Sequence, residues 1–219
     1  MSSREKQKLL LFGGTGGLGD KLVDELEWDY WVTPVGSQAV NVRFRDEVDD
    51  IIEQYSPDIV VNLAGTNYDS FLHKLTEDTI EVDDVVDVNV LGAVHIMSSA
   101  LNHMRPKGYG RIIMASSVLA EKVQVGTGLY SATKCFVDSL VRTASAENIG
   151  KGITVNSLRM GYFDGGMCHR IPEKFQEGIK ENIGLHRWGN IKELAQTIDY
   201  LVRTEYITGQ NINISGGLL

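Results

Sequence analysis

Several features that mark other classes of protein are scarce in this chain of 219 residues. Two cysteines, Cys135 and Cys168, are too few for a disulfide scaffold and lack metal-ligand spacing, so we expect reduced thiols and no metal site. No apolar run approaches the roughly 18 residues of a membrane span. The first run, residues 9–12, is also shorter than the apolar core of a signal peptide, roughly 7–15 residues. These absences favour a cytoplasmic protein without a membrane partner.

Basic residues are also in the minority. Lys and Arg number 21 against 29 Asp and Glu, which gives a net charge of −8. Because an acidic surface repels nucleic acid and anionic lipid, neither is expected as a partner. Apolar residues make up 42% of the chain and charged residues 23%, the balance of an ordinary globular protein, and no low-complexity linker or repeat divides the chain. We therefore expect one domain over residues 1–219.

Short apolar runs alternate with amphipathic stretches, which is typical of alternating strands and helices. The apolar runs are continuous, as expected for parallel strands that are buried on both faces. Seven strands are predicted, at residues 8–12, 30–35, 39–44, 59–63, 111–115, 153–158 and 211–214. Helices are predicted at residues 17–27, 46–55, 82–104, 130–148 and 191–203. The expected fold is α/β: a Rossmann-like, doubly wound, mainly parallel seven-stranded sheet with helices on both faces.

A glycine-rich turn, residues 12–19, separates the first predicted strand from the first predicted helix. Gly13, Gly17 and Gly19 have the spacing G-x-x-x-G-x-G. A dinucleotide pyrophosphate binds where backbone N–H groups and a helix N-terminus face it with no side chain in the way. A glycine run alone would indicate only a tight turn. Between a strand and a helix, it predicts nucleotide binding.

A second motif, Tyr130-x-x-x-Lys134, begins a later predicted helix. The i, i+4 spacing places both side chains on one helical face. The pKa of tyrosine is about 10, and a neighbouring ammonium group lowers it. We therefore expect Tyr130 to exchange a proton with an alcohol or carbonyl oxygen. Ser117, just after a predicted strand, would orient that oxygen, and Ser116 is the alternative.

Together these motifs resemble the short-chain dehydrogenase/reductase family, in particular its compact members of the 3-oxoacyl-(acyl-carrier-protein) reductase type. Four residues stand in the order and spacing of the family's catalytic set, namely Asn89, Ser117, Tyr130 and Lys134. The sequence Asn62-Leu63-Ala64-Gly65 is similar to the family's Asn-Asn-Ala-Gly. Residues 207–210 and 215–217 are similar to its closing segment. The resemblance extends over almost the whole chain.

The resemblance implies NAD(P)-dependent hydride transfer between nicotinamide and a carbonyl or alcohol carbon of a small molecule. Tyr130 would be the general acid in reduction and the general base in oxidation, and Ser117 would polarise the substrate oxygen. Lys134 would lower the pKa of the tyrosine and bind ribose, and Asn89 would support a proton relay. An NADPH-dependent ketone or 3-oxoacyl-type reductase is favoured. The alternatives are a dehydrogenase of a sugar, polyol or biosynthetic intermediate, and a non-catalytic dinucleotide-sensing protein.

The resemblance also implies a set of cofactor-binding residues, namely Gly13, Thr15, Gly16, Gly17, Leu18, Gly19, Ser37, Asn41, Asn62, Ala64, Gly65, Tyr130, Lys134 and Gly161. An acid at the end of the second strand would select NAD, and this chain has none there. Ser37 would instead accept a 2′-phosphate, with Arg43 or Arg45 nearby, and Asn41 would contact adenine. NADP is therefore favoured over NAD.

The chain departs from the family pattern after residue 158. Met160 stands where the family has proline, and no threonine follows, so backbone groups of Tyr162 or Phe163 would contact the carboxamide instead. Residues 162–188 are expected to form a short substrate lid. Because family members assemble through their two long helices, here residues 82–104 and 130–148, we expect a homodimer or homotetramer.

Overall fold

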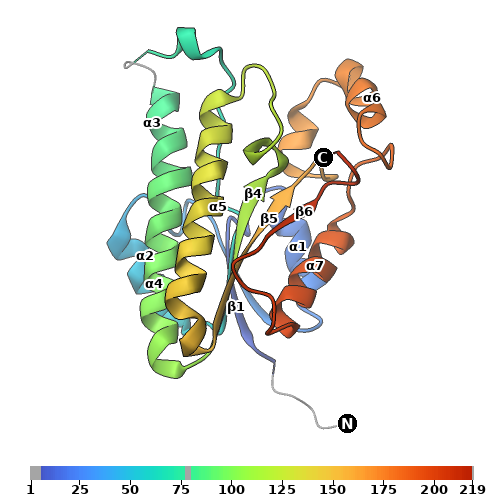
Figure 1. Ribbon diagram of the computed structural model, residues 1–219. Helices are drawn as coiled ribbons and strands as arrows, with labels where there is room; N and C mark the ends of the chain where they lie inside the picture. The colour runs from blue at the N-terminus through green and yellow to red at the C-terminus, as the bar shows by residue number, and fades with distance from the viewer. Residues whose placement is uncertain (1–5, 77–79, 219) are drawn as a thin grey trace.

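The computed structural model describes residues 6–76 and 80–218. Within these residues lies one parallel sheet of six strands in the order β2-β1-β3-β4-β5-β6 (Figure 1). The strands are β1 (Lys8–Phe12), β2 (Trp31–Val35), β3 (Ile59–Asn62), β4 (Gly110–Ser117), β5 (Ile153–Met160) and β6 (Asn211–Ile214). The strand order reverses between β1 and β3, and ligands of such sheets bind outside the carboxyl ends of the strands at this point.

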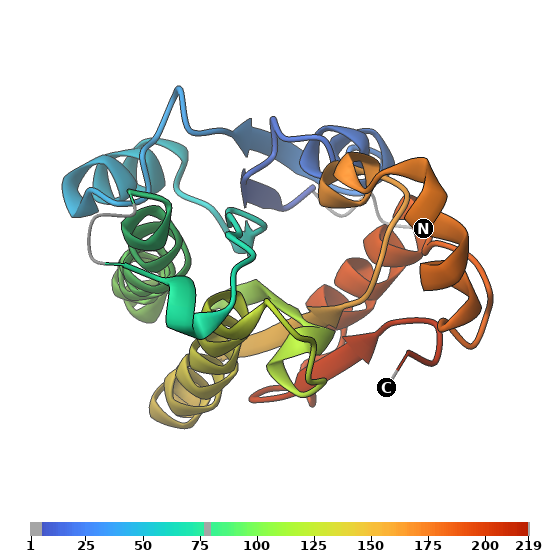
Figure 2. The ribbon, with the colours of Figure 1, turned by 90° about the horizontal axis from the view of Figure 1, so that it is seen from above.

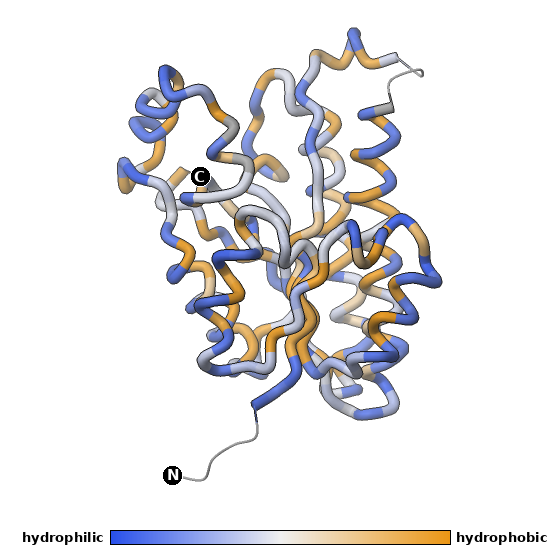
Figure 3. Tube along the Cα trace, turned by 180° about the vertical axis from the view of Figure 1, so that it is seen from behind, coloured by the Kyte–Doolittle hydropathy of each residue, from blue (hydrophilic) through white to orange (hydrophobic). Residues whose placement is uncertain are grey.

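Helices cover both faces of the sheet, as Figures 1 and 2 show. One face packs against α2 (Arg45–Tyr55), α4 (Gly92–Lys107) and α5 (Gly128–Asn148), and the other against α1 (Gly19–Leu26) and α7 (Ile191–Arg203). Along β1, Leu10 and Phe12 join the first core and Leu9 and Leu11 the second. Figure 3 shows the hydrophobic strands at the centre and hydrophilic residues on the outer sides of the helices. Burial on both faces accounts for the continuous apolar runs.

The doubly wound α/β fold is confirmed, and the bounds of β1, α7 and β6 coincide with the predicted ones. The seventh strand, predicted at residues 39–44, is wrong because that segment is a loop. Val40 and Val42 are buried, which produces the alternating pattern of a strand. They pack into the core beside α4, where the ring nitrogen Nδ1 of His95 lies 3.0 Å from the backbone oxygen of Val42. β2 is therefore the edge of the described sheet.

The helix predicted at residues 82–104 consists of three consecutive pieces, α3 (Ile80–Val86), a π-helical turn η2 (Asp87–Leu91) and α4. The wide turn carries Asn89. Residues Glu81–Lys107 have the length and apolar composition of a membrane-spanning helix, but half of the apolar window is buried inside the protein. The core helix of a globular domain has the same character, so this feature is weak evidence for a membrane.

The segment after β5 leaves the sheet and lies beside the glycine-rich turn. Met160, in the place of the family's proline, continues β5 and pairs with Ser117 of β4 and Ile214 of β6. The chain then forms the short helices η5 (Gly166–Arg170) and α6 (Glu173–Glu181). Figure 2 shows this segment next to α1. Two shorter connections, η1 (Leu72–Lys74) and η3 (Val118–Ala120), also lie at this end of the sheet.

Candidate active site

A cavity of about 2000 Å³ lies at the carboxyl ends of the strands. Its walls come from the glycine-rich turn after β1, the loop after β2, the segment after β3, the end of β4, the start of α5 and the segment after β5. The expected site residues that line it are Gly13, Thr15, Gly16, Gly17, Leu18, Gly19, Ser37, Asn41, Ala64, Gly65, Ser117, Tyr130, Lys134 and Gly161. Asn62 and Asn89 lie outside this lining.

The glycine-rich turn approaches the end of β3 so closely that it has no room for side chains. Gly13 has φ +76°, and a Cβ on it would lie 2.8 Å from the backbone N of Ala64. A Cβ on Gly19, where α1 begins, would lie 2.2 Å from the Gly13 carbonyl oxygen. Among the described residues, no protein acceptor pairs with the N–H groups of Gly17 and Leu18. These donors are therefore free to bind an anion.

Asn62 braces this turn from beneath the cavity. It is the last residue of β3, it is buried, and its Oδ1 accepts a hydrogen bond of 2.9 Å from the N–H of Ala64. Ala64 is also the residue that Gly13 approaches. Asn62 thus fixes the backbone that the glycine-rich turn touches, which agrees with a supporting position rather than a direct contact with a ligand.

The candidate catalytic side chains meet where β4 ends against the first turns of α5. The hydroxyl of Ser117 is close enough to the phenol of Tyr130 to lower its pKa, and its Oγ accepts a hydrogen bond of 3.1 Å from the N–H of Leu119. Lys134 lies one turn after Tyr130, with Nζ 5.5 Å from the centre of the tyrosine ring, and it donates a hydrogen bond of 3.0 Å to the carbonyl of Ala115. Ser116 donates to the backbone carbonyl of Lys134. The geometry therefore favours Ser117 over Ser116 as the partner of Tyr130.

Burial dominates the ionisation of this pair. Tyr130 is only 8% exposed, and burial raises its pKa to about 12, although the hydrogen bond from Ser117 lowers it. Burial lowers the pKa of Lys134 to about 8, against the opposing charge of Asp138. The lowering of the tyrosine pKa that the sequence predicted is thus outweighed by the loss of water around the phenol. At neutral pH, Tyr130 keeps its proton and is able to donate it.

Asn89 holds the segment after β3 to α5. Its side chain is 2% exposed. Its Oδ1 accepts from the N–H of Thr66 at 2.9 Å, and its Nδ2 donates to the carbonyl of Thr66 at 2.8 Å and to Oγ1 of Thr133 at 3.1 Å. A Cβ on Gly65 would lie 3.3 Å from Oδ1 of Asn89 and 3.4 Å from Nζ of Lys134. Gly65 therefore leaves open the space where these two polar groups come closest to the cavity.

The loop after β2 forms the far end of the cavity. Ser37 and Asn41 line it, and Oδ1 of Asn41 accepts a hydrogen bond of 3.2 Å from the N–H of Arg43. Arg43 also lines the cavity, with its guanidinium 2.9 Å from a carboxylate oxygen of Asp84. Arg45 instead belongs to α2 and pairs with Asp49 at 3.0 Å, outside the lining. Of the two arginines expected near Ser37, only Arg43 faces the cavity.

Sequence reasoning missed a buried charged group behind the site. Asp138 is 2% exposed and lies on α5 one turn after Lys134, where it pairs with Arg159 of β5. The signal was available, since an aspartate four residues after Lys134 shares its helical face.

The residues of the cavity fit a nicotinamide dinucleotide. The glycine-rich turn offers unpaired N–H groups at one point, and Ser117, Tyr130 and Lys134 stand at another, with one continuous cavity between them. A pyrophosphate suits the first group, because it is an anion and no side chain of the turn would block its approach to the N–H groups. A ribose and a reacting oxygen match the hydroxyl and ammonium groups of the second.

Comparisons with known proteins agree with this site. A family model described as enoyl-(acyl carrier protein) reductase matches residues 20–219. The chain is 32% identical over 216 residues to 3-oxoacyl-(acyl-carrier-protein) reductase FabG of Staphylococcus epidermidis, which covers 94% of this chain and 86% of the relative. It is 34% identical to the protein of the same name from Staphylococcus aureus, with 94% and 85% covered.

A solved structure described as ElxO with NADP bound has the same fold. It superposes with a TM-score of 0.87 over 98% of this chain and 99% of that chain, at 23% sequence identity. The family model begins just after the glycine-rich turn and covers the catalytic motif and the strands β2 to β6. The chain therefore belongs to the short-chain dehydrogenase/reductase family of NAD(P)-dependent oxidoreductases.

Proposed function

We propose that this protein reduces a small ketone or 3-oxoacyl-type substrate with NADPH. One observation carries the proposal: Ser117, Tyr130 and Lys134 stand together at the wall of the cavity that begins at the glycine-rich turn. A protonated tyrosine is a donor, which suits a reaction in which a carbonyl becomes an alcohol. The two relatives named 3-oxoacyl-(acyl-carrier-protein) reductase support this substrate class.

The mechanism assigns a separate task to each catalytic residue. When bound, NADPH would supply a hydride from C4 of its nicotinamide ring to the carbonyl carbon. Ser117 would donate a hydrogen bond to the carbonyl oxygen and hold it beside Tyr130. The hydroxyl of Tyr130 would give its proton to that oxygen, and the charge of Lys134 would stabilise the phenolate that remains. Asn89 would keep the segment at Thr66 in place, so that water near Lys134 can return a proton to Tyr130.

The proposed cofactor contacts follow the lining of the cavity. Residues of the glycine-rich turn, namely Gly13, Thr15, Gly16, Gly17, Leu18 and Gly19, would surround the pyrophosphate. Ala64, Gly65 and Lys134 would border the ribose of the nicotinamide, with Gly161 beside its ring and Asn62 supporting Ala64 from below. The preference for NADP is supported by the loop at residues 36–43, which carries no acid and places Ser37 and Arg43 at the cavity.

We also propose that residues 162–188 form the substrate lid of a single domain. Support comes from their contacts with the glycine-rich turn, because a Cβ on Gly17 would lie 3.3 Å from Gly166. Nζ of Lys21 on α1 donates a hydrogen bond of 3.0 Å to the carbonyl of Asp164. The segment thus reaches from the end of β5 to the glycine-rich turn and α1, across the cavity in which a bound substrate would be enclosed.

The two long helices are the proposed contact between copies of the chain in a homodimer or homotetramer, in the cytoplasm. Val86 and Leu91 are exposed apolar residues on this helical stretch, next to the π-helical turn. Light scattering of the purified protein would give its mass in solution. A monomer at micromolar concentration would contradict the assembly.

The function is tested by turnover with NADPH and with NADH across a panel of ketones and 3-oxoacyl thioesters. We expect NADPH to be oxidised fastest with a 3-oxoacyl or small ketone substrate. Tyr130→Phe should reduce kcat at least about 100-fold, because the proton donor is lost. Cofactor binding without turnover across the panel would favour a dinucleotide sensor. Tighter binding of NADH would reverse the cofactor preference.

A further inference from the structure

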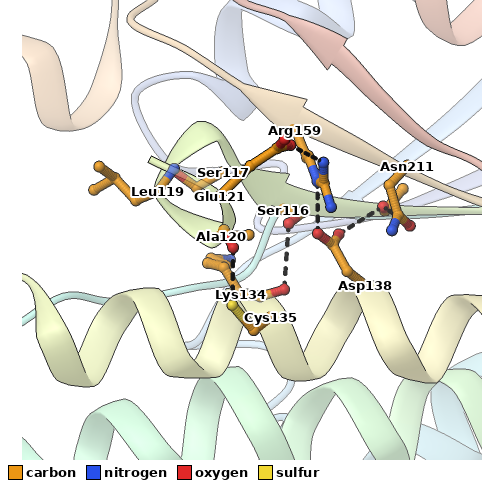
Figure 4. Close-up of polar contacts among 11 residues, drawn as sticks. Ser116, Ser117, Leu119, Ala120, Glu121, Lys134, Cys135, Asp138, Arg159 and Asn211 are labelled. Carbon is orange, nitrogen blue, oxygen red and sulfur yellow. Dashed lines mark hydrogen bonds and ion pairs between the residues drawn. The ribbon is translucent and has the colours of Figure 1, made fainter. Parts of the chain in front are cut away.

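A network of polar side chains lies behind the catalytic face of α5, with a buried centre and an exposed outer end at Glu121 (Figure 4). Its centre is Asp138, which is 2% exposed. Nε of Arg159 on β5 donates to one carboxylate oxygen of Asp138 at 2.7 Å. The other oxygen lies 2.9 Å from the hydroxyl of Ser157, which also lies 2.8 Å from Oδ1 of Asn211 on β6. Nη1 of Arg159 bonds the carboxylate of Glu121, the residue that ends η3.

The network connects the chain segments that carry the candidate catalytic groups. Glu121 follows Ser117 by four residues, and Asp138 follows Lys134 by one helical turn. Arg159 lies two residues before Gly161, which lines the cavity. The single guanidinium of Arg159 thus joins the end of β4, the middle of α5 and the end of β5. A shift of the end of β4 against α5 would move Ser117 relative to Tyr130, since these residues lie on the two elements.

Stability alone is a poor explanation for such a network. Replacing a buried ion pair by apolar residues of similar size is often neutral or stabilising, because both charges must be taken out of water. Lys134 itself is buried, and its ammonium group donates to the carbonyl of Ala115. A carboxylate one turn away on the same helical face therefore affects an ion that has little water to screen it.

We propose that Asp138 and Arg159 are positioning residues of the active site: they hold the end of β4 against α5 and together set the net charge that Lys134 faces. This inference rests on the proposed function, because the network is proposed to act on the catalytic residues Lys134, Tyr130 and Ser117. Of these three residues, Lys134 is the one that carries a charge at neutral pH, so it is the one that neighbouring charges affect most.

The charged and titratable groups around Lys134 come from each element packed against it. Tyr130 and Asp138 lie on its own helix, Arg159 on β5, Glu121 after η3, and Asp69, which acts on Tyr130, in the segment after β3. The charge of Asp138 raises the pKa of Lys134 against the effect of burial. Removing that charge should lower the lysine pKa further. Removing the cation of Arg159 should raise it, because the charge of Asp138 is then less compensated.

The test compares Asp138→Asn with Arg159→Gln, which affect the same ion pair from opposite sides. The readout is the pH titration of the Lys134 side-chain NMR signals in the purified protein, assigned by their loss in Lys134→Met. We expect shifts of about one pKa unit in opposite directions, downward for Asp138→Asn and upward for Arg159→Gln. The matched control is Glu205→Gln, which removes the carboxylate that pairs with Arg111 at the other end of β4 and should leave the titration of Lys134 unchanged.

The same variants should separate this inference from the proposed function. In Asp138→Asn, kcat/KM should begin to fall at lower pH, with a loss of about fivefold near pH 8 if the lysine pKa drops by one unit. Opposite NMR shifts without turnover on any substrate would support the network and contradict the proposed function. If the enzyme turns over but the pKa of Lys134 does not shift, or shifts in the same direction in both variants, the proposed role of the network is contradicted. If Asp138→Asn fails to fold, the test rests on Arg159→Gln. An upward shift of the Lys134 pKa in that variant would support the proposed role of the network, and an unchanged pKa would contradict it.

Discussion

The two walls of the cavity are held in different ways. The wall made by β4, η2 and α5, here called the inner wall, is fixed by buried polar side chains. Asn89, Lys134 and Asp138 are each no more than 5% exposed. The opposite wall, residues 161–188, here called the outer wall, packs Phe163 and Ile183 into the core but carries its ion pairs at the surface. Its ion pair between His169 and Asp164 has side chains that are more than half exposed, and Lys180 pairs with an exposed Glu177.

This difference separates the chemistry from the choice of substrate. A buried polar group that loses its partner costs about 1–3 kcal/mol, so the buried wall has one favourable arrangement. Exposed ion pairs contribute about 0–1 kcal/mol, so the surface side chains of the outer wall can change with little effect on folding as long as Phe163 and Ile183 stay in the core. The proton donor is thus held rigidly, and the segment that would contact the substrate is free to adapt.

The largest effect is expected when a buried polar side chain of the inner wall is removed. Asn89→Ala leaves the N–H and C=O of Thr66 and the hydroxyl of Thr133 without this partner. We expect the free energy of unfolding to fall by about 3 kcal/mol, measured by urea denaturation. A loss below about 1 kcal/mol would mean that water replaces the amide, and that the inner wall is no more rigid than the outer one.

Lys134→Met should separate stability from activity. Burial lowers the pKa of Lys134 from 10.5 to about 8, so charging this lysine at pH 7 opposes folding by about 3 kcal/mol. Losing its hydrogen bond to Ala115 offsets about 1 kcal/mol, so the variant should be about 2 kcal/mol more stable at pH 7 and inactive.

The pH dependence of this gain has a definite sign. Below pH 8 the lysine is charged in both the folded and the unfolded chain, and the full penalty applies. Between pH 8 and 10.5 only the unfolded chain keeps the proton, so the wild type regains stability as the pH rises. Urea denaturation at pH 7 and pH 10 should therefore show the advantage of the methionine variant shrinking. An advantage that is equal at both pH values would contradict the assigned shift.

A smaller effect is expected where the outer wall rejoins the core. Asn190 caps α7 by accepting a hydrogen bond from the N–H of Lys192, and the carboxylate of Glu193 accepts one from the N–H of Asn190. Asn190→Ala should reduce the free energy of unfolding by about 1 kcal/mol. Asn190→Ser is the control, because serine also caps helices and should retain most of the stability. Equal losses in both variants would rule out the cap as the cause.

The smallest change in stability is expected within the outer wall itself. His169→Ala removes an exposed partner of Asp164 at the edge of the cavity. The free energy of unfolding should change by less than about 0.5 kcal/mol, while KM for the substrate changes more than kcat. Phe175→Ala, an exposed residue of α6 outside the cavity lining, is the matched control. A large loss of stability in His169→Ala would show that the outer wall is as firmly fixed as the inner one.

Elements with a strong local pattern were predictable, and elements defined by their neighbours were not. β1, β6 and α7 were placed correctly because their apolar periodicity is undisturbed. The segment 39–44 has the alternation of a strand, but its two buried valines face α4 rather than a neighbouring strand. The π-helical turn at Asn89 was also invisible, since residues 82–104 have ordinary helical spacing. Both outcomes depend on packing partners that are distant in sequence.

The sequence by itself determined the order of strands and helices, the glycine-rich turn and the spacing of Ser117, Tyr130 and Lys134, because periodicity and short motifs are local properties of the chain. Only the tertiary structure decided that Asn62 and Asn89 support the cavity from outside, and that Arg43 rather than Arg45 reaches it. It also decided that burial, and not the neighbouring lysine, governs the pKa of Tyr130. Water exclusion and long-range pairing arise only when β4, α5 and β5 pack together, and no local pattern encodes them.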